Sequence, residues 1–237
     1  MFEASGLSDP GCVRSNNEDF LIYDPHRGIF IVADGMGGAN AGEFASRLSA
    51  ETLYDFLLSD TGSDPPSVDQ GFAEANKAVR QAAGESPDLD GMGTTLLAVR
   101  SLNGTRVEVA SVGDSRAYLL SGGEFSLLTQ DQTWVAEVGS RLGLSEEALR
   151  RHPMRHVLTM AVGAAAELRI FKHTVNVRPG DQILLCSDGL HGVVDEKTLK
   201  STLDSEKSLP QKCHYLIEAA KEHGGPDNIT AVLVQVL

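Results

Sequence analysis

The sequence is poor in cysteine and contains no long hydrophobic run. Its three cysteines, Cys12, Cys186 and Cys213, lie far apart and form no Cys-x-x-Cys pair, so we expect free thiols in a reducing compartment and no disulfide framework. No stretch approaches the ~18 apolar residues of a membrane span. The opening residues, MFEASGLSDPG, have no basic start and no apolar h-region. We therefore expect a cytoplasmic protein with no signal peptide and no membrane association.

Positive charge is scarce as well. Twenty Lys and Arg residues face 33 Asp and Glu residues, which gives a net charge of −13 and disfavours nucleic acid or an anionic membrane as the main partner. The same excess of carboxylates is compatible with divalent cations. The seven histidines form no ligand cluster. His152 and His156 are spaced like a zinc-binding pair on a helix, but Pro153 disfavours that helix.

What remains is the composition of an ordinary globular protein. With 237 residues, of which 41% are hydrophobic, the chain can bury a substantial core, and we expect one domain over residues 1–237.

Residues 130–163 differ from the rest, because Trp134 and several arginines lie there among short helical signals. One such signal is Ser145 as an N-cap before Glu146 and Glu147. We expect this segment to leave the core as a flap.

Two patterns divide the rest of the chain. Apolar runs rich in β-branched residues predict strands at 20–24, 28–33, 94–100, 105–111, 115–120, 167–177, 182–187 and 229–237. Helical spacing of apolar residues predicts helices at 41–59, 67–83 and about 208–222, the last followed by Gly224 as a C-cap. Because the strands come in clusters separated by a helix pair, we expect an α+β fold of largely antiparallel sheets with helices packed outside.

Four carboxylates lie at the edges of predicted strands, each beside a residue that lets the backbone turn. They are Asp34 in IVADGMGG, Asp114 in ASVGDSRAY, Asp188 in LLCSDGL and Asp227 in GPDNITAVLV. Taken singly, each fits a turn or a cap, and Asp-Gly is a common hairpin signal. If the sheet order brings them together, their repulsion is on the order of several kcal/mol in a partly desolvated site. Mg²⁺ or Mn²⁺ offsets such repulsion, so the set predicts a divalent cation site.

A second polar cluster lies near the N-terminus, in SDPGCVRSNNEDF. Arg14 precedes Glu18 and Asp19 by four and five positions. An arginine beside acids can form a surface ion pair of little energetic consequence. Its planar fork suits a pair of phosphate oxygens equally well. The residues alone leave both interpretations open.

Six short motifs together resemble one family. SDPGCVRSNNED, VADGMGG, GMGTTLLAV, SVGDSRAYLL, LLCSDGL and GPDNITAVLV occur in the order and approximate spacing of the PPM family, the metal-dependent type 2C protein serine/threonine phosphatases, and most resemble its compact bacterial members. Each motif is weak alone, but six in register across about residues 5–236 are specific. The resemblance implies a four-layer α-β-β-α sandwich with a two-metal centre at one end.

The resemblance also implies roles for the metal ligands. Asp34 matches the acid that bridges two Mn²⁺ or Mg²⁺ ions, and Gly35 matches the residue that gives its carbonyl to the second ion. Asp188 and Asp227 match the acids that hold the first ion. Asp34 is then expected to end its strand where both cations can be reached. Asp114 matches the ligand of a third metal, with Asp188 also near it.

The remaining roles concern water and substrate. Glu18 and Asp19 match acids that act largely through metal-bound water, and Arg14 matches the arginine that binds the substrate phosphate. A hydroxide bridging the two metals is expected to attack phosphorus directly, without a phospho-enzyme. The implied partners are phosphorylated proteins and a cognate Ser/Thr kinase, and the implied state is a monomer.

The sequence departs from the family at the position of the general acid. Many relatives carry histidine where this chain has Met36 or Ala39, and the nearest polar substitute, Asn40, is a poor proton donor. Gln132 likewise stands where histidine is frequent, so the contacts of the flap are expected to differ. The identity of the general acid is open at this point.

Two other functions compete with a general protein phosphatase. One is a regulatory module that keeps the fold but is catalytically silent, although the presence of Asp34, Asp188, Asp227 and Arg14 argues against silence. The other is a phosphatase specialised for one partner, such as an anti-sigma antagonist or a secretion-system component. Surface loops determine such specificity, and their sequences do not identify the partner.

Overall fold

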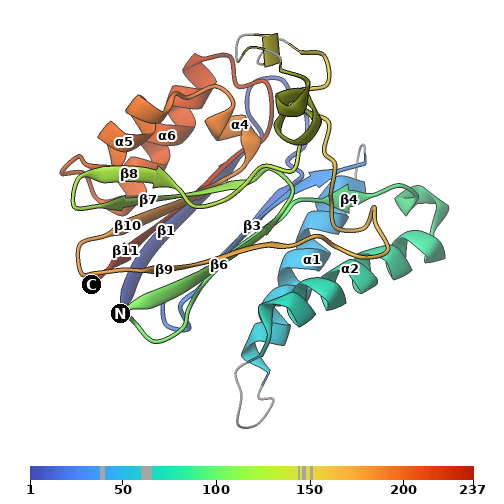
Figure 1. Ribbon diagram of the computed structural model, residues 1–237, viewed down its shortest axis with the longest axis horizontal. Helices are drawn as coiled ribbons and strands as arrows, with labels where there is room; N and C mark the ends of the chain where they lie inside the picture. The colour runs from blue at the N-terminus through green and yellow to red at the C-terminus, as the bar shows by residue number, and fades with distance from the viewer. Residues whose placement is uncertain (38–40, 60–65, 144, 146–147, 150–151) are drawn as a thin grey trace.

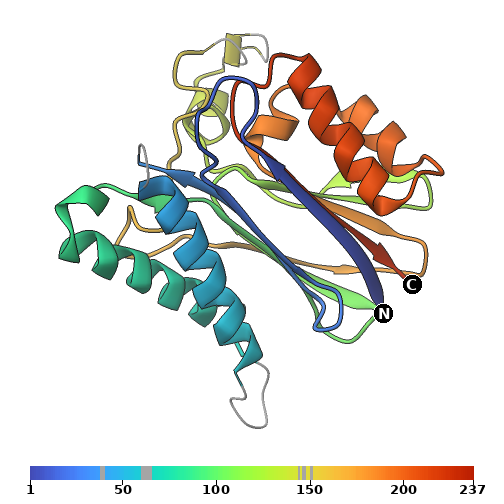
Figure 2. The ribbon, with the colours of Figure 1, turned by 180° about the vertical axis from the view of Figure 1, so that it is seen from behind.

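Two antiparallel sheets pack face to face and carry helices on their outer faces (Figures 1 and 2). The computed structural model describes the chain except for residues 38–40, 60–65, 144, 146–147 and 150–151. One sheet has the strand order β1-β11-β10-β7-β8 and the other β2-β3-β5-β6-β9, with the short β4 paired to β3. The predicted α+β sandwich is confirmed. No helix among the described residues has both the length and the apolar character needed to cross a membrane.

The elements follow one another in clusters, as the sequence predicts. The strands are β1 (Phe2–Asp9), β2 (Asp19–Asp24), β3 (Ile29–Met36), β4 (Gly93–Thr94), β5 (Leu96–Ser101), β6 (Arg106–Val112), β7 (Arg116–Ser121), β8 (Glu124–Leu127), β9 (Phe171–Asn176), β10 (Gln182–Cys186) and β11 (Ile229–Val236). The helices are α1 (Ala41–Leu58), α2 (Val68–Glu85), α4 (Asp188–His191), α5 (Glu196–Leu203) and α6 (Leu209–Glu222), with short helical turns at Pro87–Leu89, Val135–Gly139 and Ser140–Leu142.

Both faces of the central strands are buried, which explains why their sequences are continuously apolar. In β3, Phe30 and Val32 belong to the core between the two sheets. Ile29, Ile31 and Ala33 belong to the core between the second sheet and helices α1 and α2. A third core lies between the first sheet and helices α4, α5 and α6. The two outer cores hold the helix layers in place on either side of the sandwich.

The elements that the sequence analysis missed are short or lie at an edge. Strand β1 carries few apolar residues, yet it pairs with β11 along its whole length, from Phe2 opposite Val236 to Asp9 opposite Ile229. Strand β8 and helix α4 have four residues each, and α5 has eight. The strand predicted at 167–177 begins only at β9, because the residues before it pack against the helix core.

Strand β3 does not end at Asp34, contrary to the sequence prediction. Gly35 pairs with Thr94, and Met36 pairs with Gly93, so the strand continues through both residues. An Asp-Gly hairpin turn is excluded for the same reason. The side chain of Asp34 therefore projects from a strand that is hydrogen-bonded on both sides, and we expect this to fix its position more firmly than a turn would.

The predicted flap is an excursion closed at its base. The amide of Trp134 donates to the carbonyl of Val157 at 2.8 Å, and the amide of Thr159 donates to the carbonyl of Gln132 at 2.8 Å. Ser145 caps a helical turn, since its Oγ accepts from the amide of Ala148 at 3.3 Å. Glu146 and Glu147 lie outside the described residues. The excursion begins and ends beside the sheet ends described next.

Candidate active site

Five carboxylates meet at one end of the sandwich. Asp19 begins β2 and lies opposite Asp34 of β3 in the antiparallel register. Asp188 begins α4 after β10, Asp227 shortly precedes β11, and Asp114 shortly follows β6. The charges of the other four all act on Asp34, so the group draws on both sheets. The sheet order thus brings together the four acids that the sequence analysis placed at strand edges, and Asp19 joins them.

A cleft of about 1170 Å³ opens over the carboxylates. Its lining includes, among others, Arg14, Glu18, Asp34, Gly35, Met36, Asp114, Arg155, His156, Asp188 and Asp227. Asp19 is only 7% exposed and lies behind this surface. Arg14 and the acids expected to hold metal or water thus reach the cleft or lie directly behind it.

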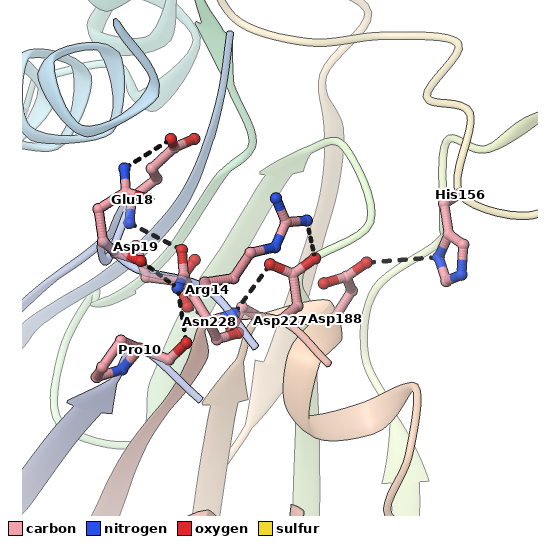
Figure 3. A network of polar contacts seen from close by, with 10 residues as sticks. Pro10, Arg14, Glu18, Asp19, His156, Asp188, Asp227 and Asn228 are labelled. Carbon is pink, nitrogen blue, oxygen red and sulfur yellow. Dashed lines mark hydrogen bonds and ion pairs between the residues drawn. The ribbon is translucent and has the colours of Figure 1, made fainter. Parts of the chain in front are cut away.

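Asp188 and Asp227 come together because Gly189 has no side chain. A Cβ at Gly189 would lie 2.0 Å from the carbonyl oxygen of Asn228, a distance that no real side chain tolerates. The first turn of α4 therefore rests directly on the backbone that leads into β11. This contact places the two carboxylates side by side in the cleft (Figure 3).

Gly35 serves a similar purpose on the second sheet. A Cβ there would lie 2.2 Å from the carbonyl oxygen of Gly42 and 2.6 Å from that of Glu18. The sequence analysis treated this glycine as a residue that lets the backbone turn, whereas the structure shows that its side-chain space is filled by the backbone of α1 and of Glu18. Asp34 itself is fixed by its neighbours, since its amide donates to Thr95 Oγ1 at 2.9 Å.

The carboxylates repel one another and retain protons. Burial, followed by the charges of Asp19, Asp188 and Asp114, raises the pKa of Asp34 well above its usual value. Burial and the charge of Asp188 raise the pKa of Asp114 to about 8. Burial also pushes the pKa of Asp188 upward, but contacts with His156 and with Asp34 outweigh it, and the net shift is downward. The cluster therefore binds protons where a cation would otherwise provide the positive charge.

Only one of the two carboxylate oxygens of Asp19 has hydrogen-bond partners among the described residues. Its Oδ2 accepts hydrogen bonds from Ser187 Oγ at 2.7 Å and from Thr230 Oγ1 at 2.6 Å. Its Oδ1 is buried and has no hydrogen-bond partner among the described residues. Burial raises the pKa of Asp19 to about 7, against the two hydroxyl hydrogen bonds. A buried carboxylate oxygen without a partner is rare and fits the acceptor of a metal-bound water.

The oxygen atoms that line the cleft fit hard divalent cations as ligands. Carboxylate and main-chain oxygens are the ligands that Mg²⁺ and Mn²⁺ prefer, and no cysteine lines the cleft. Among the described residues, no three acidic, histidine or cysteine side chains are already gathered into a complete ligand group. Water would therefore complete the coordination of a bound cation, as the chemistry of Mg²⁺ favours.

Arg14 reaches the same acids from the N-terminal loop. Its Nη2 lies 2.8 Å from Asp227 Oδ2, and both side chains are partly exposed, 53% and 37%. The hydrogen bond with Asp227 and the charge of that acid raise the pKa of Arg14 further. Figure 3 shows the guanidinium over Asp227, with Asp188 beyond it. The fork thus lies where it can contact an anion bound over the carboxylates.

Comparison with known proteins identifies this arrangement. Residues 14–234 match the family described as protein phosphatase 2C. The chain belongs to the protein phosphatase 2C family. The family expected from the six motifs is therefore confirmed.

Similar proteins include bacterial serine/threonine phosphatases. The chain is 37% identical over 231 residues to the serine/threonine protein phosphatase PstP of Mycobacterium tuberculosis, covering 97% of this chain but only 44% of that protein. It is 35% identical to the serine/threonine phosphatase stp of Listeria welshimeri, covering 96% of this chain and 93% of that protein. The chain thus spans less than half the length of the mycobacterial relative and nearly the full length of the other.

Solved structures agree with the sequence match. The catalytic domain of serine threonine protein phosphatase PstP, solved in complex with 2 manganese ions, superposes with a TM-score of 0.88 at 34% identity, covering all of this chain and 98% of that one. The layered sandwich described above is thus the protein phosphatase 2C fold.

Glu18 contributes its backbone as well as its carboxylate in this member of the family. Its carbonyl accepts from the amide of Gly35 at 3.1 Å and from Ser46 Oγ at 2.6 Å. Its Oε1 accepts from Asn16 Nδ2 at 2.9 Å. The loop before β2 is therefore tied to β3 and α1 at the residue that the sequence analysis selected for its charge.

His156 is a cleft residue to which the sequence analysis gave no site role. Its Nδ1 lies 3.6 Å from Asp188 Oδ2, and its side chain is 60% exposed. Figure 3 places it across Asp188 from Arg14. The sequence analysis considered His156 only in a disfavoured zinc pair with His152, because its place beside Asp188 depends on how the flap returns to the sheet.

Two departures from the family pattern can be located. Met36 ends β3 and lines the cleft, whereas Ala39 and Asn40 lie outside the described residues. Gln132 is buried, and its Oε1 accepts from the amide of Gly113 at 2.9 Å while its Nε2 donates to the carbonyl of Arg169 at 2.6 Å. Gln132 thus joins the end of β6 to the chain that follows the flap, and both ends of its amide take part in these structural bonds.

Proposed function

We propose that this chain is a divalent-metal-dependent phosphatase that hydrolyses phosphoserine and phosphothreonine in proteins. The convergence of five carboxylates and an arginine fork on one cleft, in a member of the protein phosphatase 2C family, carries the proposal. We further propose a cytoplasmic monomer, with residues 1–237 as one domain and proteins phosphorylated by a cognate Ser/Thr kinase as substrates.

The proposed roles follow from the positions of the side chains. Asp34 would bridge two cations, with Asp188 and Asp227 on the first and the Gly35 carbonyl on the second. When bound, two Mn²⁺ or Mg²⁺ ions would lower the pKa of a water held between them, so that it attacks phosphorus as hydroxide, and would offset the charge of the phosphate. Glu18 and Asp19 would accept hydrogen bonds from water ligands.

The substrate is proposed to bind between the acids and the N-terminal loop. Arg14 would hold two non-bridging phosphate oxygens and orient phosphorus for in-line attack by water. A phosphocysteine intermediate is not proposed, because none of the three cysteines, all of them described, lines the cleft. Asp114, on which the charge of Asp188 acts, would hold a third cation.

Hydrolysis of p-nitrophenyl phosphate is the direct test. We expect hydrolysis with Mn²⁺, its loss with excess chelator and its return when Mn²⁺ is restored. The same assay with Mg²⁺ ranks the two ions. Hydrolysis that is unaffected by the chelator would contradict the metal assignment. A protein that binds Mn²⁺ but hydrolyses neither this substrate nor phosphopeptides would instead be a silent binding module.

Substitution of Arg14 tests the phosphate contact. Arg14→Ala removes a charge-assisted contact of roughly 1.5 to 3 kcal/mol, so we expect KM for a phosphopeptide to rise roughly 10- to 150-fold with little change in Mn²⁺ affinity. Arg47→Ala is a matched control, since its side chain is also 53% exposed and paired to an acid, Glu43, but lies outside the cleft. An unchanged KM together with weaker Mn²⁺ binding would show that Arg14 serves only as an ion pair for Asp227.

A further inference from the structure

The loop that carries Arg14 has little regular structure of its own. Residues 10–18 connect the end of β1 to the start of β2 and contain turns and bends only. Val13, which directly precedes Arg14, is 70% exposed. An orienting role for Arg14 requires that this loop occupy one position, because a displacement of about 1 Å at a substrate contact can cost ~10²-fold in rate. The side chain that holds the loop is therefore part of the site.

Asn228 spans the loop from one end to the other. Its Nδ2 donates to the carbonyl of Pro10 at 3.1 Å and to the carbonyl of Asn16 at 2.8 Å. Its Oδ1 accepts from the amide of Glu18 at 2.8 Å. These three bonds bracket Arg14 on both sides (Figure 3). Asn228 is only 6% exposed, so water offers little replacement for a lost bond.

The chemistry of the amide suits this position. Two donors and one acceptor on a single planar group are required, and only asparagine offers them at this length. Aspartate of the same shape keeps the acceptor for Glu18 but cannot donate to Pro10 or Asn16. Serine is too short to reach all three partners. The choice of residue is therefore explained by the loop and not by the strand that follows.

The backbone of Asn228 is fixed to the metal ligands at the same time. Its amide donates to Asp227 Oδ1 at 2.9 Å, and the other oxygen of that carboxylate pairs with Arg14. Its carbonyl oxygen lies against Gly189, next to Asp188. One residue thus relates the arginine loop to two of the acids.

We propose that Asn228 is the positioning residue that sets the Arg14 loop in register with the carboxylates, so that phosphate is held in line. This inference rests on the proposed function for its catalytic meaning. Its structural content, an Arg14 loop ordered by one side chain, can be measured without turnover. The side-chain bonds of Asn228 go to the backbone of residues 10–18, so its effect on the substrate would be exerted through the loop.

The test combines exchange, binding and kinetics in the full chain. Asn228→Ser and Asn228→Asp are expected to speed amide hydrogen exchange across residues 10–18 in the metal-free protein. In Mn²⁺-loaded protein, both are expected to weaken binding of inorganic phosphate and to raise KM for a phosphopeptide about tenfold. In the Arg14→Ala background, the same substitutions are expected to change KM less than about twofold, because the contact that they misplace is already absent.

Asn76→Ser is the matched control. Asn76 is buried to the same degree, 4% exposed, and also bonds to three backbone groups, those of Gly163, Ala165 and Ala166. It should lower the melting temperature without faster exchange at residues 10–18, and its effect on KM should add to that of Arg14→Ala. Asn228→Asp keeps the test available if the serine variant does not fold.

The outcomes separate this inference from the proposed function. Unchanged exchange at residues 10–18, unchanged phosphate binding, or effects of Asn228 and Arg14 that simply add would each overturn the positioning role. If the wild type hydrolyses no phosphate ester with Mn²⁺, the proposed function fails. Exchange and phosphate binding then still decide whether Asn228 orders the loop.

Discussion

Asp34→Asn should abolish phosphatase activity and at the same time make the metal-free protein more stable. The substitution keeps the shape of the side chain but removes the charge that would bridge two cations. We expect activity under saturating Mn²⁺ to fall by roughly 10³-fold or more, equivalent to about 4 kcal/mol of barrier. A loss within about tenfold, or ~1.4 kcal/mol, would contradict the two-metal assignment.

The gain in stability depends on pH in a defined direction. The pKa of Asp34 is well above its usual value in the folded protein, because of burial and of the charges of its neighbours. The folded state therefore binds more protons than the unfolded state above about pH 4, and the stability of the metal-free wild type falls as pH rises. Asp34→Asn removes the group responsible for this fall in stability at higher pH. The difference in melting temperature between variant and wild type should thus be large at pH 8 and shrink toward pH 4.

We expect Mn²⁺ to make the wild type more stable than Asp34→Asn, the reverse of the order expected without metal. Mn²⁺ that binds only the folded state should raise the melting temperature of the wild type, and far less that of Asp34→Asn. Asp181→Asn is a suitable control, since Asp181 is buried and its carboxylate accepts from the turn amide of Arg178 at 2.9 Å, outside the cleft. It should lower stability at every Mn²⁺ concentration and leave the metal dependence of activity intact. A difference between Asp34→Asn and wild type that does not vary with pH would show that repulsion is not relieved at Asp34.

The sequence predicts the acids well because each lies at a chain position that the sheets bring to one end. Asp34, Asp188 and Asp227 follow or precede strands whose apolar patterns are strong, so their convergence needs only the strand order. Asp114 follows from the same reasoning. Even so, the pattern misplaced the end of β3, because the pairing of Gly35 and Met36 with β4 depends on a two-residue strand without any apolar signal.

The parts that could not be predicted depend on contacts between distant segments. Asp19 looked like one acid among several, whereas its bonds to Ser187 and Thr230 join residues far apart in the chain. Asn228 stands beside a predicted ligand, yet nothing in GPDNITAVLV indicates that its side chain faces residues 10–18. His156 depends on the return path of the flap. Periodicity reports which face of an element is buried, not which loop covers it.

Many relatives carry histidine where this chain has Met36 or Ala39, so the proton donor must be sought among other residues. Nε2 of His191 lies 3.0 Å from the carbonyl oxygen of Asp114, and desolvation together with the charge of Arg116 lowers the pKa of His191 to about 4. His191 is therefore neutral near pH 7, and it does not line the cleft as His156 does. Gln132 uses its amide in structural bonds. Among the described histidines, His156 lines the cleft, and it is held 3.6 Å from Asp188.

The ratio of kcat on p-nitrophenyl phosphate to kcat on a phosphoserine peptide should therefore be high in the wild type. A serine alkoxide needs a proton as it leaves, whereas nitrophenolate leaves readily without one. Ala39→His should lower the ratio by speeding hydrolysis of the peptide alone. A general acid contributes ~10²-fold or more, so that even a poorly placed imidazole should give a measurable gain.

His156→Gln distinguishes this expectation from its main rival. The contact with Asp188 raises the pKa of His156, and the imidazole points at a proposed metal ligand. We therefore expect the ratio to be unchanged in His156→Gln across pH 5 to 9, the range in which an imidazole titrates. If this variant instead slows only the peptide and loses the decline of kcat at high pH, then His156 donates the proton. In that case Ala39→His should bring no gain, because the leaving oxygen already receives its proton from the flap.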